Sequence, residues 1–157
     1  MGNRLLEVNN LKVAFPVGNV MAEAVRGVSF EINTGDAVGV LGESGSGKSV
    51  TALAILRLIP STGRITEGSV KFAGNDLLRV NEANMRRLRG RDLSMVFQDP
   101  LTAFNPALRI GRQLLNVIRT HTSTTMQQSR TRALEVLDLV GLPNPARVMR
   151  SYPHELS

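Results

Sequence analysis

The 157-residue sequence contains no cysteine and no tryptophan, and it has only one tyrosine. Without cysteine, neither disulfide bonds nor thiolate metal sites can form. No apolar run is long enough to cross a membrane, because the longest, at residues 52–59, is interrupted by Arg57. The first ten residues also lack the apolar segment of a signal peptide. These absences lead us to expect a cytoplasmic protein.

The sequence has few acidic residues. They are outnumbered by sixteen arginines and three lysines, which leaves a net charge of +6. Such a field attracts phosphate groups on nucleotides, nucleic acids or membranes. The densest cluster is MRRLRGR, residues 85–91. Charge runs are more often a solvated face than a binding surface. Few aromatic residues accompany these arginines, which argues against base stacking, and we expect no nucleic-acid partner.

The apolar pattern predicts mainly strands in the first hundred residues. Residues 5–15 and 25–32 alternate apolar and polar side chains, as half-buried antiparallel strands do. The nearly continuous apolar run at residues 36–42 is typical of a strand buried on both faces. Further strands are expected at residues 69–74 and 92–97.

Helical spacing of apolar residues predicts one helix at residues 48–59 and two more near the end of the sequence, at 110–121 and 127–143. For the last of these, Thr124 and Gln127 suit a capping box at the start, and Gly141 and Pro143 suit a stop. The change from strand-rich to helix-rich sequence lies near residue 100 and makes two subdomains plausible.

The strongest chemical signal is GESGSGKS, residues 42–49, which lies between the expected buried strand and the first expected helix. It matches the pattern G-x-x-x-x-G-K-[ST]. Gly42, Gly45 and Gly47 allow backbone angles that a Cβ would block, so that amide groups can turn inward onto a polyphosphate. Lys48 can reach the terminal phosphates, and Ser49 can offer its hydroxyl to Mg²⁺.

A second stretch, SMVFQDPLTAFNP at residues 94–106, narrows the choice among phosphate-binding proteins. Together with residues 27–49 and the final SYPHELS, it resembles the ATP-binding subunits of ABC transporters, in the dipeptide, oligopeptide and nickel importer group. The resemblance covers essentially the whole chain. It implies an α/β fold of the ABC-type P-loop NTPase, truncated, with an antiparallel β subdomain and P-loop core at residues 1–106. Residues 107–157 would be the start of a helical subdomain.

The resemblance also assigns nucleotide contacts. They fall on Phe15 and on the Walker A residues Gly42, Glu43, Ser44, Gly45, Ser46, Gly47, Lys48, Ser49 and Val50. Val50 stands where many members have threonine, so only its backbone amide would contact the α-phosphate. Phe15 matches an aromatic residue that stacks on adenine, although a plain core position on a strand is the alternative.

Gln98 matches the Q-loop glutamine, which in the family contacts Mg²⁺ and the attacking water and responds to the state of the nucleotide. Ser49 and Gln98 are therefore the implied contacts of Mg²⁺. Leu156 and Ser157 match the first two residues of the ABC signature, in which the serine contacts ATP bound by the opposite subunit. His154 would lie at the entry to the signature helix. No residues match the Walker B strand, the D-loop or the switch histidine.

The resemblance implies a subunit that couples binding and hydrolysis of ATP to uptake of a small solute, with peptides favoured. Its partners would be membrane permease subunits and a second ATP-binding subunit, at the inner face of the cell membrane. Because the catalytic half is missing, we expect little or no ATPase activity from this chain alone. We also expect residues 36–42 to have unpaired edges and an exposed apolar face.

Two alternatives remain open. One is a non-hydrolytic nucleotide-binding module or truncated regulatory product. The other is a DNA-associated ABC ATPase, which is disfavoured because the expected helices are short and lack sustained heptads. Whether the sequence ends by natural truncation or as an incomplete record is also left open, as is the transported solute.

Overall fold

The computed structural model describes residues 3–156, except for the side chain of Thr102. The chain divides into two compact units, residues 1–86 and residues 87–157, called here the first unit and the second unit. The expected boundary between the β-rich and helical subdomains, at residues 106 and 107, lies further along the chain and stays a prediction.

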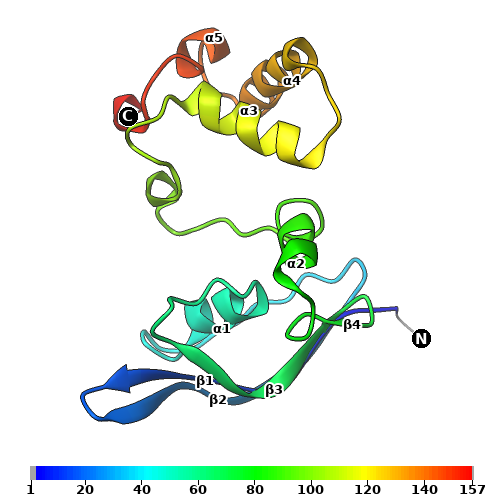
Figure 1. The fold of residues 1–157 in the computed structure, drawn as a ribbon, viewed down its shortest axis with the longest axis vertical. Coiled ribbons are helices and arrows are strands. Elements are labelled where there is room, and N and C mark those ends of the chain that lie inside the picture. The colour runs from blue at the N-terminus through cyan, green and yellow to red at the C-terminus, as the bar shows by residue number, and fades with distance from the viewer. Residues whose placement is uncertain (1–2, 157) are drawn as a thin grey trace. The chain divides into compact units, whose positions relative to one another are not determined.

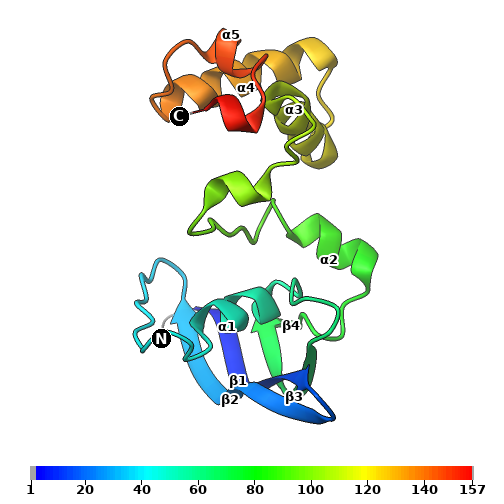
Figure 2. The same ribbon diagram turned by 90° about the vertical axis from the view of Figure 1, so that its left-hand side faces the viewer.

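The first unit is built on an antiparallel sheet with the strand order β2-β1-β3-β4 (Figure 2). Its strands are β1 (Arg4–Val17), β2 (Val20–Asn33), β3 (Arg64–Phe72) and β4 (Asn75–Asp76). The strands predicted at residues 5–15 and 25–32 are confirmed. Of the strand predicted at 69–74, residues 69–72 belong to β3, whereas Ala73 and Gly74 form the turn before β4. The hairpin between β1 and β2 turns at Gly18, whose φ of 60° is left-handed.

The core of the first unit comes from the alternation along these strands. Val8, Leu11, Val13 and Val70 are fully buried. Helix α1 (Lys48–Ile55) lies on one face of the sheet and buries Thr51 and Ala54 (Figures 1 and 2). The sheet thus supports the residues that open α1.

Helix α1 is shorter than the predicted 48–59. The chain turns away at Arg57, which has a left-handed φ of 53°. Its guanidinium donates hydrogen bonds to the backbone oxygens of Leu77 and Val80, and it forms an ion pair with Glu82 at 3.6 Å. These contacts with distant residues end the helix where the local apolar pattern would continue it.

The second unit is helical. Its elements are η1 (Pro100–Ala103), α3 (Ile110–His121), α4 (Met126–Leu139), α5 (Pro145–Val148) and η2 (Pro153–Glu155), and α2 (Glu82–Leu88) begins in the first unit and ends in the second. Helix α3 has the predicted bounds. The buried core of the second unit is formed by Ile110, Leu137 and Val148. No helix within residues 3–156 has the length and apolar content needed to span a bilayer.

The start of α4 differs from the prediction by one residue. Thr125 and Gln128 form the capping box, not Thr124 and Gln127. The hydroxyl of Thr124 instead lies 2.8 Å from the hydroxyl of the buried Ser129, which removes it from the capping position. The end of α4 agrees with the prediction, because Gly141 follows the helix with a left-handed φ of 75°.

Two predicted strands are wrong. Residues 36–42 and 92–97 have no strand structure in the described chain, apart from one isolated bridge between Leu93 and Arg89. Apolar composition predicts a buried strand only where neighbouring strands supply hydrogen-bond partners, and neither segment has them here. The exposed apolar face expected at residues 36–42 is confirmed, since Leu41 is 95% exposed.

Candidate functional site

The loop at residues 42–49 leads directly into α1 and has the backbone of a phosphate-binding turn. Gly45 and Gly47 have φ values of 79° and 90°, in the left-handed region that favours glycine. Gly42 is not left-handed, but a Cβ there would lie 2.7 Å from the hydroxyl of Ser46. The backbone conformation therefore favours glycine at residues 45 and 47, whereas a Cβ at residue 42 would only require the hydroxyl of Ser46 to move.

Gly47 also joins the loop to the sheet. A Cβ at this position would lie 2.5 Å from the backbone oxygen of Ala24 and 3.3 Å from Val25 on β2. The carbonyl of Gly47 accepts bonds from both the amide and the hydroxyl of Thr51, at 2.8 and 2.9 Å. The first turn of α1 is thus held against β2 by close backbone contact.

Lys48 is half-buried and points back into the loop. Its Nζ donates to the backbone oxygens of Gly42 and Glu43, both at 2.7 Å, and to the hydroxyl of Ser46 at 3.3 Å. An ammonium held by neutral carbonyls can exchange them for phosphate oxygens, which bind it more strongly because they carry charge. The free amides at the start of α1 favour an anion at the same place.

The residues after Lys48 extend the site along the first turn of α1. Ser49 is exposed and Val50 is half-buried. Among the described residues, no three His, Asp or Glu side chains gather closely enough to hold a metal ion. A cation at this site would therefore depend on hydroxyl and phosphate oxygens, which Mg²⁺ prefers as ligands.

An apolar groove of about 470 Å³ borders the loop. One wall is the sheet, including Val28 and Phe30, and another is the exposed segment with Val38, Val40 and Leu41. The apolar part of this lining does not suit a triphosphate, because buried phosphates need hydrogen-bond donors or cations, which this groove has on the side of the loop at Ser46 and Lys48. The groove is the structural consequence of the unpaired segment at residues 36–42.

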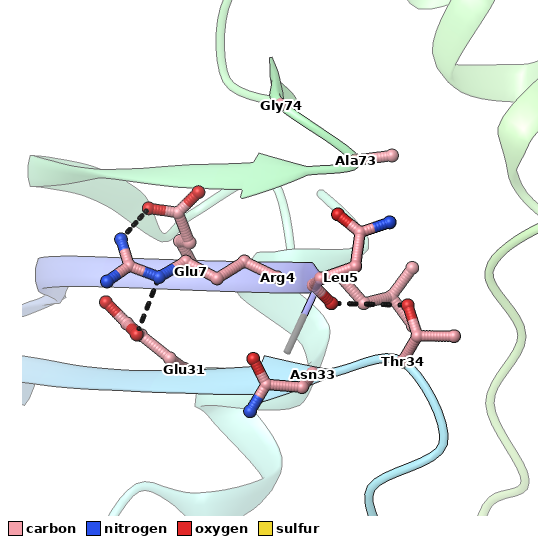
Figure 3. Close-up of a pocket in the computed structure, with 9 residues that line it drawn as sticks. Arg4, Leu5, Glu7, Glu31, Asn33, Thr34, Ala73 and Gly74 are labelled. Carbon is pink, nitrogen blue, oxygen red and sulfur yellow. Dashed lines mark hydrogen bonds and ion pairs between the residues drawn. The ribbon is translucent and has the colours of Figure 1, made fainter. Parts of the chain in front are cut away.

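A larger pocket of about 870 Å³ lies at another part of the sheet (Figure 3). Arg4 faces it, but this arginine already pairs with Glu7 at 3.5 Å and with Glu31 at 3.0 Å. With its positive charge balanced by two carboxylates, the pocket is a poor place for a phosphate. Size alone therefore does not identify the site.

Phe15 lies on β1, opposite Ala22 on β2, and is half-buried. Its ring packs on the backbone of Gly63, just before β3. A partly exposed ring is compatible with either role considered for this residue, so its contact with adenine stays a prediction. Sequence patterns gave no indication of the contacts made by Gly63 and Ala24, because both depend on strand register.

Three further predicted residues belong to the second unit. Gln98 is exposed and precedes η1, which Asp99 caps by accepting a bond from the amide of Leu101 at 3.1 Å. Its contacts with Mg²⁺ and water stay predictions. His154 lies in η2, with its ring stacked on Tyr152 at a centroid distance of 5.7 Å. Ser157 lies outside the described residues.

Two transport ATP-binding proteins align with nearly the whole of this sequence. The oligopeptide transport ATP-binding protein OppD of Bacillus subtilis (strain 168) is 41% identical over 155 residues, which are 98% of this chain and 43% of that protein. The probable D,D-dipeptide transport ATP-binding protein DdpD of Escherichia coli (strain K12) is 40% identical over 158 residues, which are 100% of this chain and 48% of that protein. The chain thus spans less than half the length of these relatives.

Solved structures agree in fold. The dimeric structure of MJ0796, described as a bacterial ABC transporter cassette, has a TM-score of 0.82 at 24% identity, covering 98% of this chain and 63% of that one. A post-hydrolysis dimer of the same cassette bound to ADP and Pi has a TM-score of 0.80. A family profile described as ABC transporter matches residues 25–157. The chain therefore belongs to the ABC transporter family and has the fold of part of its ATP-binding cassette.

Proposed function

We propose that this chain is the part of a peptide-importer ATPase that binds the phosphates and base of ATP. The observation that supports this most directly is the loop at residues 42–49, which has two left-handed glycines and a lysine ammonium that points back onto the backbone oxygens of Gly42 and Glu43. The peptide-transport names of relatives that are 40–41% identical support peptides as the solute. Coupled hydrolysis and uptake belong to the complete transporter.

Each loop residue has a distinct task in this proposal. Lys48 exchanges the carbonyls of Gly42 and Glu43 for oxygens of the β- and γ-phosphates. The amides from Glu43 to Val50 donate to the phosphate chain, and glycine keeps the loop narrow enough for them to converge. The exposed hydroxyl of Ser49 fits Mg²⁺, which would supply positive charge against the phosphates when bound. Gln98 would complete the cation and water contacts.

Phe15 would stack on adenine. Because the sequence has no tryptophan, Phe15→Trp introduces a single indole whose fluorescence reports on that position alone. We expect Mg-ATP to change its emission, and Mg-tripolyphosphate, which lacks a base, to leave it nearly unchanged. An equal response to both ligands would contradict stacking at Phe15.

The proposed partners are membrane permease subunits and a second ATP-binding subunit, at the inner face of the cell membrane. The dimeric cassettes of similar fold support the second subunit. In that assembly Ser157 would contact the nucleotide of the opposite subunit. Transport by relatives supports the permease partners.

Calorimetric titration with Mg-ATP tests the central proposal. We expect Lys48→Ala to weaken binding at least about tenfold, since hydrogen bonds to charged groups contribute about 1.5–3 kcal/mol. Lys71→Ala is the matched control, because Lys71 is exposed on β3 and forms no ion pair with other residues of the described chain. Absence of binding by the folded wild type, or equal binding by Lys48→Ala, would refute the proposal.

A second candidate is a nucleotide-binding module that does not hydrolyse ATP. Tight binding of ATP without turnover in the protein as it occurs in the cell would support this candidate over the first.

A further inference from the structure

The ring of Phe15 rests on a residue without a side chain. A Cβ at Gly63 would come within 3.0 Å of three ring atoms, including Cζ at 2.8 Å. Gly63 is not in the left-handed region, so its backbone does not itself require glycine. The amide of Gly63 donates to the oxygen of Pro60 at 2.8 Å and closes the turn before β3. The position of the ring, and not the backbone conformation, is therefore what favours glycine at residue 63.

Strand register places small residues on both sides of this ring. β1 pairs Phe15 with Ala22 of β2, and it pairs Ala14 with Arg64 of β3. In antiparallel order, Gly63 therefore follows next to Phe15. Laterally adjacent residues share a face of the sheet. The ring thus has glycine on one side and alanine on the other, which leaves room on that face for a second flat group.

The same face carries the phosphate-binding loop. Val13 pairs with Val25, against which Gly47 packs. Val13 and Phe15 are two residues apart on β1, so their side chains point to the same side. The register shift between Val13 and Ala14 occurs in the pairing with β2, whereas the pairing of β1 with β3 is regular at these residues. Two residues correspond to about 7 Å along a strand. The ring and the loop are therefore neighbours on one surface of the first unit.

We infer that Gly63 is a positioning residue for the base of the nucleotide, because it sets the tilt of the Phe15 ring and keeps that surface open. This inference rests on the proposed roles of Phe15 and residues 42–50. Any side chain at residue 63 meets the far end of the ring, which can rotate. Substitution therefore changes the orientation of the ring and disturbs the fold little. Gly63 contributes to preference for a nucleotide over a bare polyphosphate.

The test compares Mg-ATP with Mg-tripolyphosphate by calorimetry on the full chain. We expect Gly63→Ala to lower ATP affinity about three- to tenfold, within the range for aromatic stacking, while tripolyphosphate affinity stays unchanged. The matched control is Gly39→Ala, because Gly39 is also not left-handed and a Cβ there has nothing within 4 Å. It should leave both affinities at the wild-type level.

A double mutant separates positioning from folding. In a Phe15→Leu background, Gly63→Ala should lower ATP affinity no further, because the ring through which it acts is gone. If Gly63→Ala lowered the affinities for ATP and tripolyphosphate equally, Gly63 would have a structural role and the inference would be overturned. An unchanged affinity for ATP in Gly63→Ala would also overturn it. If wild type bound neither ligand, the proposed function would fail as well. If it bound tripolyphosphate as tightly as ATP, only the base contact would fail.

Discussion

Gly47 is the residue at which backbone conformation and tertiary contact coincide. Its φ of 90° excludes most side chains, and a Cβ would also lie 2.5 Å from the oxygen of Ala24. Gly45 has a similar φ of 79°, but nothing lies within 4 Å of its would-be Cβ. A side chain at residue 45 would therefore cause backbone strain alone, whereas a side chain at residue 47 would cause both backbone strain and steric overlap.

We predict that Gly47→Ala destabilises the chain distinctly more than Gly45→Ala. The left-handed conformation alone costs about 1–2 kcal/mol for a residue with a Cβ. Gly47→Ala adds overlap with a backbone atom, which cannot move without displacing β2. Urea denaturation of both variants measures the difference. Equal losses of unfolding free energy would show that the contact between the loop and β2 is unimportant.

Lys12 and Glu67 form an ion pair at 2.9 Å between β1 and β3. The hydrogen bond that Lys12 donates to the carboxylate of Glu67 raises the pKa of Lys12 above its ordinary value of 10.5, and the charges of Glu67 and Glu23 act in the same direction. A raised lysine pKa stabilises the fold below the pKa of the unfolded chain. This contribution is lost as pH rises through the higher folded pKa.

We therefore predict that Glu67→Gln lowers the thermal midpoint slightly at neutral pH, and that its difference from wild type shrinks above about pH 10.5. Scanning calorimetry across this range gives the result. A gap that stays constant into strong alkali would mean that the charge of Lys12 is not the cause.

The N-terminal cap of α4 is one of several similar hydroxyl residues that precede the helix. Residues 122–125 are all threonine or serine. Thr125 combines an extended backbone with a partner, Gln128, at the correct spacing. The hydroxyl of Thr124 instead forms a hydrogen bond with the hydroxyl of Ser129 inside the second unit. The cap therefore follows the packing of the unit.

We predict that Thr125→Ala lowers the unfolding free energy of the second unit by about 1 kcal/mol, as loss of a helix cap does. The comparison is Gln127→Ala, an exposed position one residue from the capping glutamine, which should change little. Hydrogen exchange at the amides of the first turn of α4 reports the effect. Faster exchange in Gln127→Ala than in Thr125→Ala would reverse the assignment.

The segment at residues 36–42 is an apolar element without a partner strand. Leu41 is 95% exposed, whereas Leu11 on β1 is fully buried. Exposed apolar segments of this kind promote association between chains.

Leu41→Ser should therefore change the unfolding free energy by no more than about 0.5 kcal/mol and reduce self-association. Leu11→Ala, by contrast, should destabilise the chain by about 2–5 kcal/mol. Sedimentation over a range of concentrations, together with urea denaturation, measures both effects. A large loss of stability in Leu41→Ser would show that this segment is packed in solution.

At the scale of the whole molecule, the 157 residues contain a Walker A pattern but no Walker B pattern. We predict that the 157-residue chain hydrolyses ATP no faster than its Lys48→Ala variant, because no Walker B pattern supplies a carboxylate to orient water. A coupled phosphate-release assay checks this. A Lys48-dependent rate of about 1 per second, at the lower end for phosphoryl transfer, would contradict it.

The parts of the fold that were predicted correctly rest on local patterns. β1 and β2 alternate apolar and polar residues, and α3 has helical spacing from its first residue to its last. Residues 36–42 have an equally strong pattern, but a strand also needs a neighbour. Composition cannot show whether that neighbour is present.

The features of the candidate site likewise include some that follow from local sequence and some that depend on contacts between distant segments. The order of residues in GESGSGKS is enough to predict a phosphate-binding loop, because glycine conformation, a lysine charge and a helix start are all local properties. Contacts between distant segments determined the other features of the structure. They left residues 36–42 unpaired, set the cap of α4 at Thr125, and brought Gly63 beneath the ring of Phe15. Each of these outcomes depends on which remote groups are available to pair or to occupy space.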